Sequence, residues 1–450
     1  MYRYIIEDEN HVPPFNQPAS ELTIGRRPLK LHQEILLNEY FDRALGKSPE
    51  LRGVFKDVRD LVEVGGESVA YRDNLWFDEE FLEYFMDEAL KEAKKSGQAS
   101  RAAFSRSDDA FRNYTLPLAH DLESSVDSET GEAIYLLDLW YFPKGFTRDV
   151  KAIVVPSDAH EMGFFAVPDY MTMEQGDLTH YAPMRAVVSI ESWVHVYFAS
   201  IIFGTFARGG RIDKEIESSF FTSLKLLWQA VLEQKQILSS SSMVEIGVAC
   251  DIDPTAIIKG PTKIGDRVTI GAGAIIDNCT LGNDVSIDAG CMLYQSTVAD
   301  NCFLPFRASL YLTAVMENSI IAQNTCLQMC VVGRNTFVGA GSTFTDFNMI
   351  GNIPIKAANR HGQLESVGQG VLGGAVGHNC RIGAGMVIMP GRMIESDVVL
   401  IASPQRRVIN RSITFEESDH LLFGRDLHSR MFPRLGEKVG EDDTSWDEAW

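Results

Sequence analysis

An aliphatic side chain returns at every sixth position through much of the second half of this chain. The count slips by one residue in places and then resumes, and small or turn-forming residues fill the gaps. The repeated positions are Ile246, Ile252, Ile258, Ile264, Ile270, Ile276, Leu281, Ile287, Leu293, Val298, Leu304, Leu310, Val332, Val338, Phe344, Val376, Ile382, Ile388, Ile394 and Leu400. A short fixed period is typical of a solenoid, in which stacked coils bury one continuous apolar column.

Three hexads make one triangular coil, and each hexad supplies a short strand and a corner. An α-helix does not have a period of six, and ordinary strand alternation does not need a glycine-rich corner at each sixth step. Over about residues 244–402 the chain resembles the hexapeptide-repeat, left-handed β-helix family. The left-handedness is implied by that resemblance and not by the spacing.

Length and charge limit the remaining possibilities. A chain of 450 residues is too long for one ordinary core, so we expect two domains. The net charge of −21 disfavours nucleic acid and anionic membranes as partners. The longest apolar run, Trp193–Phe206, is too short to span a bilayer, and residues 1–8 do not resemble a signal peptide. We therefore expect a cytoplasmic protein that acts on a small molecule.

All seven cysteines lie in the solenoid region, between Cys250 and Cys380, and none forms a CxxC pair. Free buried cysteine behaves as a small apolar residue. We expect these cysteines to be packing residues in a reduced compartment, and we predict no metal site.

The pattern predicts four segments along the chain. Residues 1–210 form an α/β domain, 211–242 a connecting helix and linker, 243–412 the β-helix with an inserted loop at 345–370, and 413–450 a C-terminal helix and an acidic tail. Strands are predicted at Tyr2–Ile6, Ala133–Tyr141 and Val150–Val155, and helices at Leu29–Leu45, Glu79–Lys95, Ser189–Phe206, Asp213–Leu238 and Phe415–Phe432.

This layout resembles the sugar-1-phosphate nucleotidyltransferases with hexapeptide tails, such as the bifunctional N-acetylglucosamine-1-phosphate uridylyltransferase/acetyltransferase type. The segment Gly25–His32 resembles that family's G-[KR]-P-[LM]-x-x-H motif, with one extra arginine, and places Pro28 at the start of a helix. The family's glycine-rich phosphate loop is absent: Glu7–Pro14 after the first strand has no glycine and three acids. We therefore expect a degenerate nucleotidyltransferase-like domain without nucleotide turnover.

One histidine of the solenoid lies in a segment with a catalytic resemblance. The segment Val376–Gly383 resembles the V-x-H-[DE]-C-x-[IV]-G motif of acyltransferases, in which the histidine accepts a proton from the acceptor. This resemblance implies that His378 is the catalytic base, with acetyl-CoA as acyl donor. Asn379 stands where the family often has an acid, and we expect it to contact the substrate or the imidazole. A structural histidine at a coil corner, hydrogen-bonded or solvated, is the alternative.

Two further segments are candidate binding sites. The segment Leu400–Ile409 resembles the V-x-G-x-P-A-[KR]-x-[IV] exit of the same acyltransferases, so Arg406, Arg407 and Arg411 are predicted contacts for coenzyme A phosphates. A basic turn in an acidic protein is the alternative. The loop 345–370 interrupts the period with polar residues, and its predicted substrate contacts are Asn359, Arg360 and His361.

The sequence thus predicts a sugar-phosphate or nucleotide-sugar transferase, with acyl-CoA-dependent acetyl transfer in the β-helix as the leading chemistry. The alternatives are a non-catalytic binding or scaffold protein and a sugar-1-phosphate nucleotidyltransferase. A γ-class carbonic anhydrase needs three histidine ligands, and only His361 and His378 lie in the solenoid unless His420 or His428 folds back. The family resemblance also implies a homotrimer with a cleft between subunits.

Overall fold

The computed structural model describes residues 1–63, 65–127, 130–165, 178–218, 220–233, 240, 242–348, 353–424 and 427–437. The chain divides into two compact units, each described here by itself. Unit 1 comprises Met1–Glu9, Pro18–Leu22 and Pro28–Glu191, and unit 2 comprises Asn10–Gln17, Thr23–Arg27 and Ser192–Trp450. The chain therefore enters unit 2 twice within its first thirty residues.

Unit 1 is built on a mixed sheet with two long helices against one face. The strands are β1 (Tyr2–Ile6), β6 (Glu50–Phe55), β7 (Ser68–Arg72), β9 (Ala99–Ser105), β10 (Glu123–Val126), β11 (Ala133–Phe142) and β12 (Val150–Val154). Their order is β12-β9-β11-β7-β1-β6, with β10 paired to β11. The pairs of β1 with β6 and β7 and of β12 with β9 are parallel, whereas β11 is antiparallel to β7 and β9.

The helices of unit 1 are α1 (Leu29–Leu45) and α2 (Glu79–Ser96). The Asp78 carboxylate accepts a hydrogen bond from the amide of Phe81 and so caps the start of α2, and a left-handed glycine ends each helix. Helix α1 begins directly after Pro28, with the bounds predicted from the sequence. Alternation along β11 sends Leu139 and Tyr141 into the core beside these helices, and Trp140 and Phe142 to the opposite face.

Short elements complete the N-terminal part of the chain. They are β2 (His11–Val12), β3 (Gln17–Pro18), η1 (Ala19–Glu21), β4 (Thr23–Ile24), β5 (Arg27–Pro28), η2 (Val58–Glu63), β8 (Leu75–Phe77), η3 (Phe111–Thr115), β13 (His160–Phe165), β14 (Leu178–Ala182) and β15 (Val187–Ser189).

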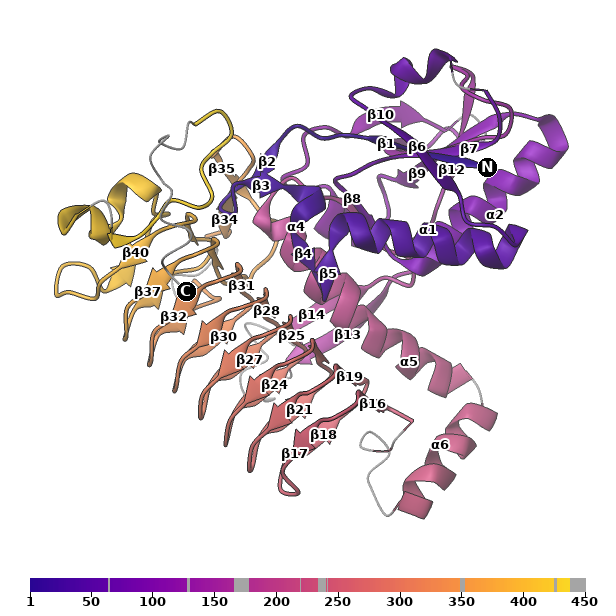
Figure 1. Cartoon of the computed structure of the whole chain (residues 1–450). Helices are drawn as coiled ribbons and strands as arrows, with labels where there is room; N and C mark the ends of the chain where they lie inside the picture. The colour runs from indigo at the N-terminus through magenta and orange to yellow at the C-terminus, as the bar shows by residue number, and fades with distance from the viewer. Residues whose placement is uncertain are drawn as a thin grey trace. The chain divides into compact units, whose positions relative to one another are not determined.

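Unit 2 is a parallel β-helix of three sheets with eight strands each, stacked along one axis (Figure 1). The first sheet contains β16 (Val244–Ile246), β19 (Thr262–Ile264), β22 (Thr280–Leu281), β25 (Thr297–Val298), β28 (Ala314–Val315), β31 (Val331–Val332), β36 (Ala375–Val376) and β39 (Met393–Ile394). The second contains β17 (Asp251–Ile252), β20 (Thr269–Ile270), β23 (Ser286–Ile287), β26 (Phe303–Leu304), β29 (Ile320–Ile321), β32 (Phe337–Val338), β37 (Arg381–Ile382) and β40 (Val399–Leu400). The third contains β18 (Ile257–Lys259), β21 (Ile275–Asp277), β24 (Met292–Tyr294), β27 (Ser309–Tyr311), β30 (Cys326–Gln328), β33 (Thr343–Phe344), β38 (Val387–Ile388) and β41 (Val408–Ile409).

The predicted β-helix is therefore confirmed, and its three parallel sheets are consistent with the left-handed form. From Ile264 onward the residues of the six-residue register are buried in one apolar column, and five of the seven free cysteines pack into it. The corners need left-handed backbone, which asparagine adopts with little strain: Asn301 has φ 58° and Asn335 has φ 55°. The repeat thus follows from one inward side chain and one corner residue per hexad.

Helices cover the outer face of the first sheet. They are α4 (Trp193–Tyr197), η4 (Phe198–Phe206) and the first residues of α5 (Ala207–Ser218), and α6 (Phe220–Glu233) follows α5. The Thr205 hydroxyl lies 3.1 Å from the Thr297 hydroxyl. The half-buried guanidinium of Arg208 donates hydrogen bonds to Thr280 Oγ1 and to the carbonyl of Pro261. The single helix predicted over Asp213–Leu238 is instead split between α5 and α6, and residues 234–239 lie outside the described residues.

The predicted helix over Phe415–Phe432 is wrong. Two short 3-10 turns, η6 (Phe415–Glu417) and η7 (Asp419–Leu422), stand at its start. The Ser418 hydroxyl and the Asp419 carboxylate accept hydrogen bonds from the amides of Val399 and Ile401, so they cap the last coil instead of continuing a helix. The predicted acidic tail lies beyond residue 437, outside the described residues.

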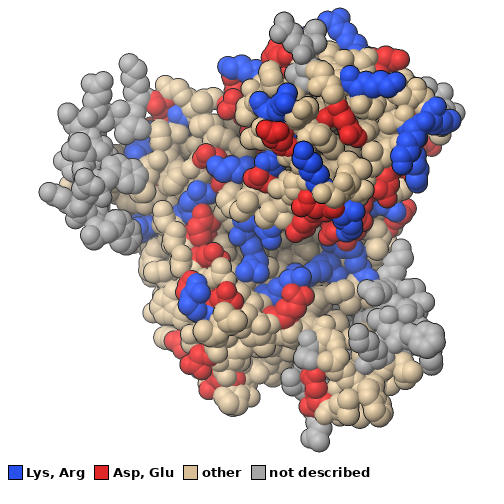
Figure 2. Space-filling model, turned by 45° about the vertical axis from the view of Figure 1, so that its right-hand side comes forward, with Lys and Arg blue, Asp and Glu red and all other residues tan. Residues whose placement is uncertain are grey.

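The net charge of −21 is not gathered into one acidic surface on the face shown in Figure 2, where acidic and basic side chains are interspersed.

Candidate functional site

The three predicted functional segments leave three different edges of the β-helix prism. The loop 345–370 connects the third sheet to the first, since it lies between β33 and β36. Its described part forms a hairpin of β34 (Lys356–Ala358) and β35 (Leu364–Ser366). His378 lies between β36 and β37, at the edge from the first sheet to the second. Arg406 and Arg407 lie between β40 and β41, at the edge from the second sheet to the third. One edge therefore does not carry all three.

His378 is fully buried at its corner, outside the apolar column. Its imidazole lies between the rings of Phe15 and Phe432, with centroids 5.0 and 4.7 Å away. Its Nδ1 accepts a hydrogen bond of 2.9 Å from the amide of Arg334, and its own amide donates to Ser396 Oγ. The ring is thus held by both neighbouring coils and by two distant aromatic residues.

The hydrogen bond from Arg334 determines the tautomer of His378. A neutral imidazole whose Nδ1 accepts must carry its proton on Nε2. That Nε2 is buried and has no hydrogen-bond partner among the described residues. Burial, and secondarily the charge of Arg334, lower the pKa of His378 well below its usual value. Proton abstraction by Nε2 is therefore not favoured in this conformation, because Nε2 is a donor with no open path to a substrate.

Two stretches of unit 2, residues 10–17 and 427–434, cover His378, and we call them the covering segments. The amide and the hydroxyl of Ser396 both donate to the carbonyl of Pro14, at 3.0 and 2.9 Å. The Asn16 side-chain amide donates to the carbonyl of Phe432 at 2.9 Å. The amide of Phe432 donates to the carboxylate of Asp397 at 2.6 Å. The two covering segments are therefore bonded to each other and to the coil beneath.

An ionic cluster fastens the second covering segment. Glu395 is buried and pairs with Arg434, which also pairs with Glu416 at 2.9 Å. Arg430 pairs with Glu437 at 2.6 Å and lies over the ring of Phe415, 4.1 Å from its centroid. Several charges in one network hold geometry better than isolated surface pairs do.

Asn379 serves the backbone rather than the imidazole. Its φ of 53° places it in the left-handed region that a corner requires. Its side-chain amide donates to Asp397 Oδ1 at 2.8 Å and to the carbonyl of Ser429 at 3.2 Å. The predicted contact of Asn379 with His378 is not formed here, and its predicted contact with substrate stays a prediction.

The three predicted coenzyme A ligands each have a partner within unit 2. Arg406 pairs with Asp419 at 2.5 Å and donates to the carbonyl of Glu417. Arg407 is exposed and donates to the carbonyl of Gly385 at 2.9 Å. Arg411 is also exposed and pairs with Glu417. Exposed guanidinium groups keep further donors for a phosphate, so Arg407 and Arg411 are better placed for one than Arg406.

The loop residues have two different roles. Asn359 is fully buried, and its carboxamide oxygen accepts from the amides of His361 and Gln363 at 2.9 Å, so it closes the turn of the hairpin. His361 is exposed at the tip beside Arg360. Arg360 and His361 lie nearer the surface than Asn359, and their substrate role stays a prediction.

Two further histidines do fold back onto the β-helix. His428 Nε2 donates to the carbonyl of Asn379 at 2.9 Å, and its ring lies 5.3 Å from that of His420. Burial lowers the pKa of His428 to about 4, helped by the charge of Arg381. Within the described ranges, no three histidine, cysteine or acidic side chains come together as a metal-binding group.

Sequence reasoning missed the cover of His378. Phe15 lies more than three hundred positions from His378 along the chain, and Phe432 more than fifty. The sequence around His378 therefore does not predict these contacts. The one available signal was the stretch Glu7–Pro14, which lacks the expected glycines. Its last residues belong to unit 2 and bind the β-helix, which accounts for the prolines where a phosphate loop would need donors.

Comparisons with known proteins support the repeat. Residues 261–295 match the family described as the hexapeptide repeat of succinyl-transferase. Two solved structures are also similar: the polysialic acid O-acetyltransferase OatWY (16% identity, TM-score 0.19, covering 46% of this chain and 98% of that one) and a hexapeptide transferase family protein from Anaplasma phagocytophilum (20%, 0.15, 39% and 88%). At these TM-scores we infer nothing from either about this chain.

Among the described residues, no helix combines the length and apolar composition needed to cross a membrane. The nucleotidyltransferase-like layout of the N-terminal domain is not confirmed by these comparisons. The three stacked sheets establish that the second half of this chain contains a parallel β-helix, and residues 261–295 within it match the hexapeptide repeat of succinyl-transferase.

Proposed function

We propose that this protein transfers an acyl group from an acyl-CoA to a small-molecule acceptor, with the site on its β-helix. The observation that carries the proposal is His378, which lies at a corner of a hexapeptide-repeat prism, outside the apolar column, with Nε2 unpartnered. A buried polar atom without a partner costs free energy, so such an atom often marks a functional position.

His378 has to change state before it can act as a base. The covering segments must move so that Phe15 and Phe432 leave the ring, and the proton must move from Nε2 to Nδ1. Moving that proton breaks the hydrogen bond from the Arg334 amide. The free Nε2 lone pair then accepts a proton from the acceptor as the acceptor attacks the thioester carbonyl, and coenzyme A leaves as the thiol.

The donor and acceptor sites favour an assembly of several copies. The candidate base and the candidate coenzyme A ligands lie at opposite edges of the second sheet of one chain. Packing a second copy against this sheet would bring its edges beside those of the first, so a homotrimer provides the shared cleft. The outer face of the second sheet suits this role because Phe303, Ile320 and Phe337 stack on consecutive coils and are each about 40% exposed.

Replacing Phe337 with aspartate is expected to break this assembly. An unpaired carboxylate at an apolar contact costs roughly 2 kcal/mol or more, which weakens association by about 30-fold. Light scattering after size-exclusion chromatography at micromolar concentration should show a trimer for the parent and a monomer for Phe337→Asp. The matched control is Thr269→Asp, at an exposed position of the same sheet outside the apolar stack. A monomeric parent would contradict both the trimer and the shared cleft.

The activity itself is tested by release of free thiol from acetyl-CoA and succinyl-CoA in the presence of sugar-phosphate and nucleotide-sugar acceptors. Binding of coenzyme A raises the melting temperature of the folded protein, so a thermal-shift screen identifies the donor first. Acceptor-dependent thiol release supports the proposal. A protein that binds neither thioester at millimolar concentration contradicts it.

A binding or scaffold role is the second candidate, and one observation favours it. His378 carries its proton on the wrong nitrogen and is covered, while each candidate coenzyme A arginine already has a partner in its own chain. A chain retained only for assembly would tolerate this arrangement. Nucleotidyl transfer is the weakest of the three, because no glycine loop follows β1.

A further inference from the structure

A cavity of about 910 Å³ opens in unit 1, on the face of the sheet that α1 and α2 do not cover. Its floor is made by β9, β11 and β12, where Arg101, Trp140 and Ala152 point away from the helices. Its walls are η2 and the stretch 143–149 between β11 and β12. The volume lies in the range of small-molecule sites, about 300–1,000 Å³.

The cavity is distinct from the edge at which open α/β sheets usually bind ligands. That edge lies at the carboxyl ends of the parallel strands. In unit 1 it carries Asp8 and Asp73, just after β1 and β7. The cavity instead borders Gln98 and Val150, at the amino ends of β9 and β12.

Basic side chains outnumber acidic ones in the lining. The four basic residues are Arg59, Arg101, Arg148 and Lys151, and the three acidic ones are Glu92, Glu123 and Asp149. Two of the basic groups are engaged. Arg101 lies over the indole of Trp140, 4.9 Å from its centroid, and pairs with Glu123 at 2.6 Å and Asp138 at 2.9 Å, while Lys151 pairs with Glu92 at 3.0 Å.

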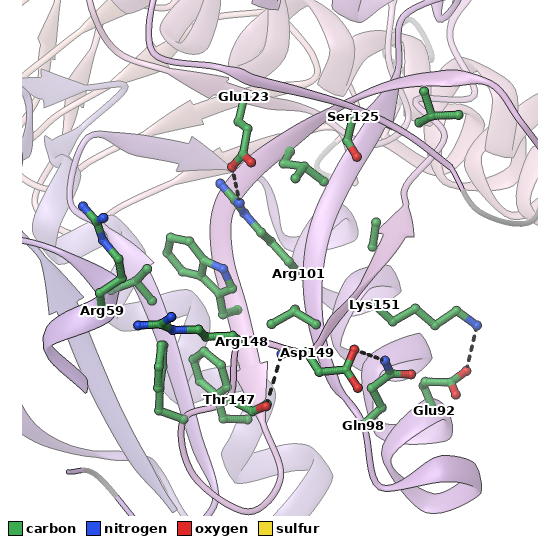
Figure 3. Close-up of a pocket in the computed structure, with 18 residues that line it drawn as sticks. Arg59, Glu92, Gln98, Arg101, Glu123, Ser125, Thr147, Arg148, Asp149 and Lys151 are labelled. Atoms are coloured by element: carbon green, nitrogen blue, oxygen red, sulfur yellow. Dashed lines mark hydrogen bonds and ion pairs between the residues drawn. The ribbon is translucent and has the colours of Figure 1, made fainter. Parts of the chain in front are cut away.

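Arg59 and Arg148 are the groups available to a ligand. Both are exposed and approach the cavity from the same side, from η2 and from the β11–β12 connection (Figure 3). Among the described residues, Arg59 pairs with the neighbouring Asp57 through Nε at 2.9 Å and Nη2 at 2.5 Å, which leaves Nη1 for a ligand. In the part of the chain that the structure describes, the guanidinium of Arg148 forms no ion pair or side-chain hydrogen bond. Arg148 therefore keeps its whole guanidinium fork for a phosphate, which such a fork binds in bidentate geometry, and Arg59 adds a second positive charge on the same side of the cavity.

The opposite side of the cavity offers neutral and acidic hydrogen-bonding groups. Glu123 and Ser125 come from β10, and Gln98 donates to Asp149 at 3.0 Å (Figure 3). Carboxylates accept hydrogen bonds, and carboxamide and hydroxyl groups both donate and accept them, so together they can bind the hydroxyl groups of a ligand. Trp140 is only 4% exposed, so its ring is not a free stacking surface for a base.

We propose that this cavity binds a small phosphate monoester that carries hydroxyl groups. Arg59 and Arg148 hold the phosphate, and Glu123, Ser125 and Asp149 receive the hydroxyls. Arg101 is fixed by its ion pairs and shapes the floor. This site is independent of acyl transfer at the β-helix and is able to bind ligand whether or not that activity exists.

Isothermal calorimetry with glycerol 3-phosphate, ribose 5-phosphate and glucose 6-phosphate tests the proposal, with inorganic phosphate and free ribose as comparisons. At least one monoester should bind in the micromolar to millimolar range, more tightly than inorganic phosphate, and ribose should not bind. Arg148→Gln and Arg59→Gln should each weaken binding by about tenfold or more, because a hydrogen bond to a charged group contributes that much. The control is Arg106→Gln, an exposed arginine of unit 1 outside the lining.

Three results would overturn the proposal. They are no binding of any monoester at about 10 mM, equal binding of phosphate and monoesters, and unchanged affinity in both arginine variants. Both arginines are exposed, so circular dichroism and melting temperature without ligand should match the parent and separate lost binding from lost folding.

Discussion

Removing the imidazole of His378 is expected to reduce acyl transfer by about 10²–10⁴-fold, the usual contribution of a general base. Coenzyme A binding should stay nearly unchanged, because the candidate phosphate ligands lie at another edge of the prism. The measurement is the initial rate of thiol release for the parent and for His378→Ala, with coenzyme A affinity from calorimetry. His378 is fully buried, so His378→Gln is needed beside it to keep the volume filled while removing the base.

The controls for this experiment separate catalysis from packing. His120→Ala removes an exposed imidazole of unit 1 and should leave the rate unchanged. Phe15→Ala loosens the cover without touching the base, so a faster reaction in this variant would support a covered, inactive state of His378. If His378→Gln transfers the acyl group as fast as the parent, His378 is not the catalytic base. If neither the parent nor any variant transfers an acyl group, the scaffold function is favoured.

The fold of unit 2 was predictable because each hexad carries its own information. One inward aliphatic residue such as Leu310 and one corner residue such as Asn301 define strand and turn without reference to distant chain. Helix α1 was predicted with its observed bounds, Leu29–Leu45, for the same reason: its end signals are local. The wrong helix over Phe415–Phe432 failed where tertiary contacts of Ser418 and Asp419 replaced helical hydrogen bonds.

The candidate site was predictable only as a set of separate residues. The motif around His378 indicated a base, but the ring environment depends on Phe15 and Phe432, which the local sequence does not connect to it. The tautomer depends on one backbone amide, that of Arg334 on the coil below. The loop 345–370 and His378 are close along the chain but leave different edges of the prism. Contacts between residues far apart in the sequence depend on how the folded chain packs, and local patterns do not predict them.

Acidification from about pH 7.5 to about pH 5 is expected to release the covering segments. Burial lowers the pKa values of His378, His420 and His428 in the folded chain, the last to about 4, so the unfolded chain binds protons near pH 6.5 that the folded chain does not. Stability that depends on these histidines is therefore present above pH 6.5 and falls as the pH drops below it. For His428, whose pKa in the folded chain is about 4, the loss is about 2 kcal/mol at pH 5, and the lowered pKa values of His378 and His420 add to it in the same direction.

One carboxyl group opposes this effect. Burial raises the pKa of Asp397 to about 6, so the folded chain keeps a proton that the unfolded chain loses near pH 4. Its contribution to stability grows on acidification through pH 6, by about 1.4 kcal/mol at pH 5. The three histidines together outweigh this one carboxyl group, so the covering segments lose stability on acidification. The charges of Arg334 and Arg381 act in the same direction as burial on His378 and His428, respectively.

Hydrogen exchange measures this directly, since amide protection reports local opening. Protection of residues 10–17 and 427–434 should fall between about pH 7.5 and about pH 5 after correction for the intrinsic rate, while the strands from β19 to β32 stay protected. In a His378→Gln, His428→Gln double variant, the loss of protection on acidification should be smaller. His420 alone then favours opening at low pH, and Asp397 opposes it. Adding Asp397→Asn to the parent should enlarge the loss. Equal protection at both pH values in the parent would show that opening does not change the protonation of these histidines, and that the cover is not linked to it.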